Sequence, residues 1–193
     1  RGAPAGSGDL RIAVYTQHFV GVGHHMRATR LARAFCRANG GPHDVVVFDG
    51  GCPVPGTDPD QGVCRVQLPP LLRGTAGIET VRADLPLSAV LVERQQEIVA
   101  GIRHLCPDLL VIDSFPFSRW ALREEILAAI SQAKTSNAAV RVVCSVRDVP
   151  RASQERFGSH VRGWDSSRGR PWPIQPDDDV LEDLPEVINS CFH

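Results

Sequence analysis

Hydrophobic and polar residues follow one another along this chain in blocks that predict short strands separated by amphipathic helices. Two runs, residues 44–49 and 107–113, are apolar nearly throughout, which is typical of strands buried on both faces of a parallel sheet. Three more strands are predicted at 12–15, 63–68 and 139–144. The first predicted helix opens at His24-His25. Its apolar face has the spacing of a core-facing helix and is formed by Ala28, Leu31, Ala32 and Phe35.

Local signals predict where the later helices begin. Asp84 is expected to cap the second helix, with Pro86 near its first position, and the helix to continue to about Cys106. Ser118 is expected to cap a third helix. The apolar face of that helix is formed by Leu122, Ile126, Leu127 and Ile130.

The alternation of strands and helices predicts right-handed crossovers and an α/β fold with a doubly wound parallel sheet. The pattern covers residues 10–148, with loops predicted at 50–62 and 69–83. At this length we expect one domain, or one domain and a fragment of another. The expected divisions are a flexible lead-in at 1–9, the domain at 10–150, an insertion or disordered loop at 151–177 and a last helix of the same domain at 178–193.

Composition argues against several classes of protein. The 193 residues include 21 basic and 22 acidic side chains, so the bulk charge does not favour nucleic acid or a membrane surface as a partner. No run approaches the roughly 18 apolar residues that a membrane-spanning helix needs. The six cysteines are widely spread and lack the spacing of a zinc site. We therefore expect reduced thiols, no bound metal and a cytoplasmic location.

The loop between the first strand and the first helix holds the strongest candidate chemistry. It reads Gly-Val-Gly-His-His-Met-Arg over residues 21–27. A strand that turns on glycines into a helix directs the free N–H groups of that helix toward a ligand above the sheet. Met26 stands where a dinucleotide fingerprint needs its third glycine, although Asp49 is placed to fill the acidic position. A P-loop is excluded, because no Gly-Lys-Ser/Thr follows.

Residues 21–27, read as Gly-x-Gly-His-x-x-Arg, resemble the first loop of GT-B glycosyltransferases of the MurG-like, family-28 kind. Two later segments match the same group in the same order, Asp-Ser-Phe-Pro-Phe at 113–117 and Cys-Ser-Val-Arg-Asp at 144–148. The resemblance implies a Rossmann-like, three-layer αβα domain, the N-terminal and acceptor-side half of a GT-B fold. It also implies that the chain is truncated before the second domain, which would hold most of the nucleotide-sugar donor site.

A protein of this group would transfer a sugar from a nucleotide-sugar donor to the hydroxyl of an acceptor compound. The resemblance implies no metal and no cofactor, because GT-B enzymes meet the diphosphate charge with helix dipoles and side chains. We interpret the chain as the N-terminal domain of such a transferase, of the hexosyltransferase class if the complete chain has the donor domain. Two alternatives stay open. One is a nucleotide-sugar hydrolase in which the same histidine activates water, and the other is a truncated, non-catalytic domain that binds a ligand or partner.

The candidate site residues follow from where the motifs fall in the predicted fold. Ligands of a doubly wound sheet bind outside the C-terminal ends of its strands, where segments 21–27, 113–117 and 145–148 are all expected. His24 is the predicted catalytic base, since a helix N-terminus favours the neutral imidazole. His25 is expected at the surface or behind the residues that contact substrate. The predicted substrate contacts are Gly21, Gly23, His18, Arg27, Asp113 and Arg147.

Each of these side chains also has a structural alternative. Asp113 would orient His24, bind an acceptor hydroxyl or cap the turn that follows it. Arg27 would reach a phosphate, hold the loop to a carboxylate or remain a solvated helix arginine. His18 would pack the loop or contact the acceptor, and Arg147 would contact substrate or form a local salt bridge. Only the tertiary arrangement separates these alternatives.

Overall fold

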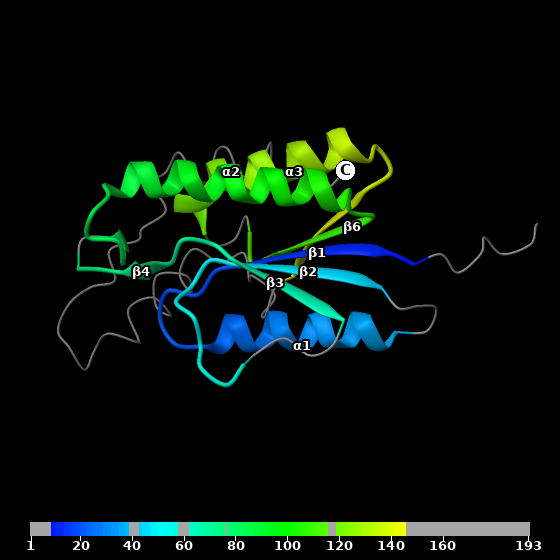
Figure 1. Ribbon diagram of the computed structural model, residues 1–193, viewed down its shortest axis with the longest axis horizontal. Helices are drawn as coiled ribbons and strands as arrows, with labels where there is room; N and C mark the ends of the chain where they lie inside the picture. The colour runs from blue at the N-terminus through cyan, green and yellow to red at the C-terminus, as the bar shows by residue number, and fades with distance from the viewer. Residues whose placement is uncertain (1–8, 39–42, 58–61, 76, 116–118, 146–193) are drawn as a thin grey trace, which may run out of the picture.

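The middle layer of the protein is a five-stranded, fully parallel sheet (Figure 1). The computed structural model describes five stretches of the chain, residues 9–38, 43–57, 62–75, 77–115 and 119–145. The strand order is β3-β2-β1-β6-β7. The strands are β1 (Arg11–Thr16), β2 (Asp44–Asp49), β3 (Val63–Gln67), β6 (Leu109–Asp113) and β7 (Arg141–Ser145). All five strands that the sequence predicts are present.

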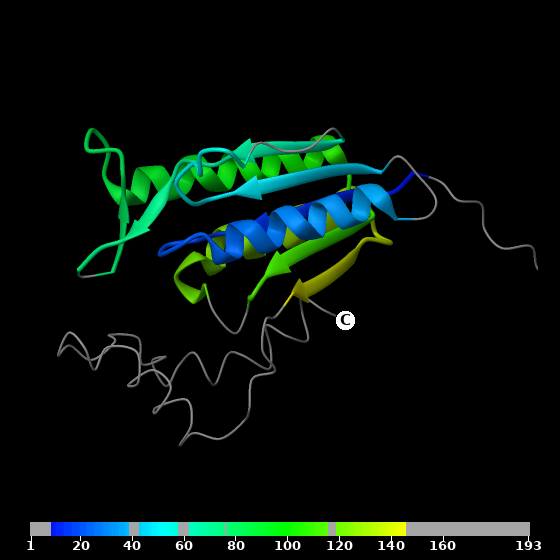
Figure 2. The same cartoon turned by 90° about the horizontal axis from the view of Figure 1, so that it is seen from below.

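Helices cover both faces of the sheet. Helix α1 (Gly23–Arg37) lies on one face, and α2 (Leu87–Leu105) and α3 (Arg123–Ser136) lie on the other, as Figures 1 and 2 show. In the part of the chain that the structure describes, no helix combines the length and the apolar character needed to span a bilayer. The helices on both faces of the parallel sheet make the doubly wound, three-layer, Rossmann-like α/β fold that the sequence predicts. The predicted segments at 151–177 and 178–193 lie outside the described residues.

Strand β1 shows how the two faces of the sheet are filled. Successive side chains of a strand point to opposite faces, and both faces are covered here, so all four central residues of β1 are apolar and buried. Ala13 and Tyr15 belong to the hydrophobic cluster beneath α2 and α3. Ile12 and Val14 belong to the smaller cluster beneath α1. None of the four is more than 2% exposed.

The segment predicted as a loop at 69–83 contains a small antiparallel hairpin, so that prediction is wrong. Its strands are β4 (Leu71–Arg73) and β5 (Ile78–Thr80), paired from Leu71 with Thr80 to Arg73 with Ile78. Three-residue strands are too short to show an alternating pattern in the sequence. Ile78 nevertheless packs against the cluster beneath α2 and α3, which gives the hairpin its place.

The start of α2 also differs from the prediction. Pro86, with extended backbone, is the residue that precedes the first helical turn, and Asp84 does not cap the helix. The carboxylate of Asp84 instead pairs with Arg82 at 3.1 Å on the surface. Proline suits a helix start because its fixed φ is compatible with the first turn and its missing N–H is not needed there. Ser118, the predicted cap of the third helix, lies outside the described residues.

A buried ion pair joins α2 to α3. The guanidinium of Arg94 on α2 donates from Nη2 to Oε1 of Glu125 on α3 at 2.6 Å and from Nε to Oε2 at 2.9 Å. Both side chains are at most 3% exposed. The hydroxyl of Tyr15 also donates to Glu125, at 2.5 Å. Burial raises the pKa of Tyr15 well above its usual value, and the charge of Glu125 raises it further.

Arg94 also binds the segments that follow the strands. Its Nη1 donates to the carbonyl oxygens of Gly50 (3.2 Å) and Pro69 (2.7 Å), and its Nη2 donates to Oε1 of Gln17 (3.0 Å). A Cβ at Gly50 would lie 2.6 Å from Nη2 of Arg94, so only glycine admits this approach. Burial lowers the pKa of Arg94, but its bonds to Glu125 outweigh that effect and the net shift is upward. The ends of β1, β2 and β3 are thereby held to α2.

Replacing Arg94 by Met should destabilise the protein by about 3–5 kcal/mol, because Glu125 would keep a buried charge without its partner. The double variant Arg94→Met/Glu125→Leu should lose less stability than the sum of the two single variants. Urea denaturation measures both. Arg103→Met, which removes an exposed guanidinium on the same helix, is the control and should change the free energy of unfolding by no more than about 0.5 kcal/mol. This account would be contradicted if Arg94→Met lowered the free energy of unfolding no more than Arg103→Met does.

Candidate functional site

A histidine–carboxylate pair lies at the C-terminal edge of the sheet. Nδ1 of His24, in the first turn of α1, is 2.5 Å from Oδ2 of Asp113, the last residue of β6. The side chain of His24 is 34% exposed, whereas that of Asp113 is 7% exposed. Asp113 is held by two further bonds, from the hydroxyls of Thr16 (3.4 Å) and Ser114 (3.1 Å). The pair therefore joins a fixed, buried carboxylate to an imidazole that solvent reaches.

Arg27 joins the same site one turn further along α1. Its Nη2 donates to Oγ of Ser145 at 2.8 Å, and its Nη1 lies 3.8 Å from Oδ1 of Asp113. Segments that are far apart in the sequence thus converge at the ends of β6 and β7, as predicted from topology. Arg147, a predicted substrate contact two residues further on, lies outside the described residues.

Two glycines at the start of α1 leave open space, Gly21 in the preceding loop and Gly23 as the first residue of the helix. A Cβ built on Gly21 or Gly23 would have no neighbouring atom within 4 Å. Gly21 has a φ of +67°, a left-handed conformation that favours glycine. Among the residues that the structure describes, no side chain caps the N-terminus of α1 by a hydrogen bond, and the first turn of the helix contains no acidic residue. The N–H groups of this turn and the open space therefore lie beside the His24–Asp113 pair.

His25 lies in the interior, so of the two positions expected for it the surface is wrong. It is 1% exposed and its Nδ1 is 2.6 Å from Oδ2 of Asp49, the last residue of β2. His18, which was predicted to contact substrate, belongs to this second group and is 6% exposed. Its Nδ1 is 3.5 Å from Oδ1 of Asp49, and its ring lies 5.5 Å from that of His25. The structure thus places His18 with His25 and Asp49, and places His24 with Asp113.

Arg65 on β3 completes the group around Asp49. Its Nη1 donates to Oδ2 of Asp49 at 3.1 Å, and its Nη2 donates to Oγ1 of Thr29 at 2.9 Å. Burial raises the pKa of Asp49, but its hydrogen bonds, those from His25 and the N–H of Gly51 among them, outweigh burial and the net shift is downward. The sequence offered one signal for this group, the acidic residue at the end of the second strand. Nothing in it indicated Arg65.

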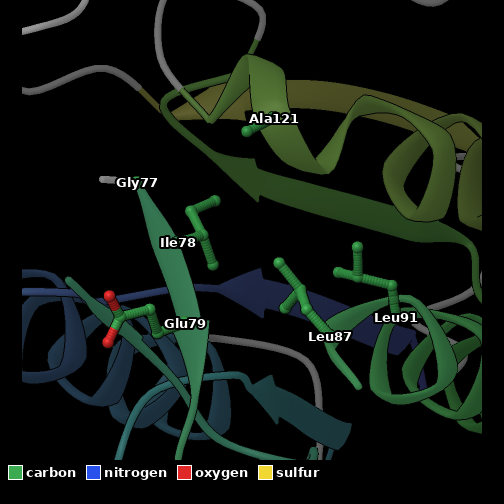
Figure 3. A pocket seen from close by; sticks show the side chains of 6 residues that line it. All are labelled: Gly77, Ile78, Glu79, Leu87, Leu91 and Ala121. Carbon is green, nitrogen blue, oxygen red and sulfur yellow. The ribbon is translucent and has the colours of Figure 1, made fainter. Parts of the chain in front are cut away.

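An apolar pocket of about 360 Å³ opens between the β4–β5 hairpin, the start of α2 and the turn Trp120–Leu122. Ile78, Leu87 and Leu91 point toward one another across it, as Figure 3 shows. The carboxylate of Glu79 extends from the other side of β5. The hairpin that forms one wall lies in the segment 69–83 that was predicted as a loop.

Known proteins resemble this chain only distantly. No family model and no curated protein matches it. Among solved structures, the C-terminal domain of a hydrogenase from Pyrococcus furiosus is 10% identical, with a TM-score of 0.43, over 76% of this chain and 95% of that domain. UGT2 of Phytolacca americana, solved with UDP-2fluoro-glucose and pterostilbene, is 12% identical, with a TM-score of 0.43, over 72% of this chain. SsfS6, a glycosyltransferase of Streptomyces sp. SF2575, is 18% identical, with a TM-score of 0.41, over 71% of this chain.

The chain spans 31% of the length of UGT2 and 39% of that of SsfS6. SsfS6 is a glycosyltransferase by name, the class that the loop at 21–27 resembles, whereas the Pyrococcus protein is named a hydrogenase. At these identities and TM-scores the likenesses decide neither family nor activity. The fold rests on the strand order and register described above.

Cys144 on β7 provides a chemical test of burial at this edge of the sheet. Burial raises the pKa of its thiol to about 11, and the charge of Asp113 contributes to the shift. Because only the thiolate reacts, about one molecule in a thousand is reactive at Cys144 near pH 8. Iodoacetamide should therefore label the exposed Cys52 and Cys64 well before Cys144, and labelling of Cys144 should rise as the pH approaches 11. Peptide mapping by mass spectrometry measures the rates, and urea-unfolded protein, in which Cys144 should react normally, is the control.

Proposed function

We propose that this chain is the acceptor-side domain of a glycosyltransferase and that His24 accepts the proton of the acceptor hydroxyl. The single observation that carries the proposal is the 2.5 Å contact between Nδ1 of His24 and Oδ2 of Asp113. The resemblance of residues 21–27, 113–117 and 144–148 to GT-B glycosyltransferases gives the class of reaction. The donor would be a nucleotide sugar and the acceptor a compound with a free hydroxyl.

The geometry of the pair suits a general base. An ionised carboxylate only accepts hydrogen bonds, so Nδ1 of His24 carries the proton that joins it to Asp113. Nε2 then holds the lone pair and can take a proton from a hydroxyl within hydrogen-bond reach. As the acceptor oxygen bonds to the anomeric carbon, the nucleoside diphosphate leaves with the electrons of the broken glycosidic bond. The charge of Asp113 stabilises the imidazolium that forms.

The surroundings of the pair support the binding of a polar substrate. Gly21 and Gly23 leave open space in front of the first turn of α1. The N–H groups of that turn and its positive dipole end favour an oxygen or an anionic group there. Arg27 lies within 4 Å of Asp113 and adds positive charge beside the imidazole. These features suit an acceptor hydroxyl together with the departing diphosphate.

Replacing His24 by Ala should lower turnover by about 10²–10⁴-fold, the usual contribution of a general base, and leave the fold intact. Asp113→Asn should also lower turnover, because an amide favours the wrong tautomer of the imidazole. The full-length protein would first be screened by thermal shift against UDP-, GDP- and dTDP-sugars, since a ligand bound by the native state raises stability. Release of nucleoside diphosphate with the donor that binds, in the presence of an alcohol panel, then measures turnover.

The matched control is His104→Ala, which removes an exposed imidazole in the last turn of α2. It should leave turnover unchanged. Unaltered turnover in a folded His24→Ala variant would remove the proposed base. Analysis of products separates the hydrolytic alternative, because a hydrolase yields free sugar whatever alcohol is present. Failure of every nucleotide sugar to stabilise the protein would favour a non-catalytic binding domain.

A further inference from the structure

The second histidine–carboxylate group, His18, His25 and Asp49, has no part in the proposed reaction. It joins three segments of the chain: the residues after β1, the first turns of α1 and the end of β2. The exposed fractions of the three side chains are 7%, 1% and 2%. One ligand atom from each side chain lies within 4.8 Å of the others. The hydrogen-bond partners of the ring nitrogens indicate which of them could bind a cation.

The proton of His18 is fixed by its backbone contact. Nε2 of His18 is 3.1 Å from the carbonyl oxygen of Cys52, which only accepts hydrogen bonds, so Nε2 carries the hydrogen. Nδ1 is therefore left with a lone pair. This buried nitrogen has no hydrogen-bond partner among the described residues, and it faces Oδ1 of Asp49 at 3.5 Å. A Cβ at Gly51 would lie 2.0 Å from the ring, so the glycine gives the imidazole its place.

The proton of His25 is fixed in the same way. Its Nε2 is 2.7 Å from Oγ1 of Thr57, and the single hydrogen of that hydroxyl is donated to the carbonyl of Val54 at 2.6 Å. The hydroxyl oxygen thus accepts a hydrogen bond from Nε2–H of His25. Nδ1 of His25 is 2.6 Å from Oδ2 of Asp49, a distance at which a hydrogen joins the two atoms, as it joins His24 to Asp113. The free lone pair of His18 thus lies beside a carboxylate and a hydrogen that a metal ion would replace, because metal ligands bind in their deprotonated forms.

We propose that His18, His25 and Asp49 bind a divalent transition-metal ion of the zinc class. Imidazole nitrogen and carboxylate oxygen are the donors that zinc accepts, and three protein ligands leave a fourth position for water. Histidines that bind metals usually donate their other N–H to a carbonyl or a similar acceptor, which fixes the ring. His18 and His25 both make such a bond, to Cys52 and Thr57.

Arg65 is the residue that opposes the metal. Its Nη1 lies 3.0 and 3.1 Å from the two ring nitrogens of His25 and donates to Oδ2 of Asp49. A positive charge at this distance repels an incoming cation and competes for the carboxylate. The other oxygen of Asp49, Oδ1, accepts from the N–H of Gly51 at 3.3 Å and faces His18. Removing the guanidinium should therefore strengthen metal binding.

The experiment measures binding of Zn²⁺ and Co²⁺ to full-length, tag-free protein that has been stripped with a chelator. Competition with a chromophoric chelator gives the affinity, and elemental analysis after dialysis gives the stoichiometry. We expect one ion per chain and a higher melting temperature with Zn²⁺. His18→Asn and Asp49→Asn should each weaken binding at least 100-fold. Arg65→Gln should strengthen it at least tenfold, a gain that misfolding does not produce.

The control is His104→Asn, which should bind as the unaltered protein does. The spectrum of the Co²⁺ form should lack a thiolate charge-transfer band, because no cysteine sulfur belongs to the proposed ligand set. Binding that persists at the same stoichiometry in the double variant His18→Asn/Asp49→Asn would place the ion elsewhere and overturn the proposal. If neither the unaltered protein nor Arg65→Gln binds a metal ion, then His18, His25 and Asp49 share only a proton. That result would also overturn the proposal. Neither result depends on glycosyl transfer.

Discussion

The guanidinium of Arg94, which has no access to solvent, holds together the edge of the sheet on which the candidate site lies. It pairs with Glu125 on α3 and donates to the backbone beyond β2 and β3. Taking these charges out of water is costly, so the arrangement persists only while each partner is present. The segments that carry His18 and Asp49 are therefore fixed by a core that is partly polar.

On this edge, two neighbouring histidines are directed to different carboxylates. His24 contacts Asp113 at the end of β6, and His25 contacts Asp49 at the end of β2. Strand β1 lies between β2 and β6, where the strand order reverses, and α1 begins just after β1. The first turn of α1 therefore stands at the switch point, the place where ligands of doubly wound sheets generally bind. One imidazole remains partly exposed, and the next is enclosed.

The hydrophobic pattern predicted the five strands, the three helices and the layered architecture, because continuous burial and the helical period leave direct traces in the sequence. The same pattern missed the β4–β5 hairpin, whose strands are too short to alternate visibly. The cap of α2 was predicted at Asp84 because the sequence shows a capping residue only by its type. In the structure, Arg82 binds the carboxylate of Asp84 instead.

The sequence by itself determined that residues 21–27 form a glycine-containing turn into a helix, and that the ends of three strands would converge beside it. Those conclusions need only local pattern and topology. Which histidine meets which carboxylate was decided by the tertiary structure, because adjacent side chains on a helix point about 100° apart and the register of distant strands selects their partners. The burial of His25 and the position of Arg65 beside it follow from that register alone.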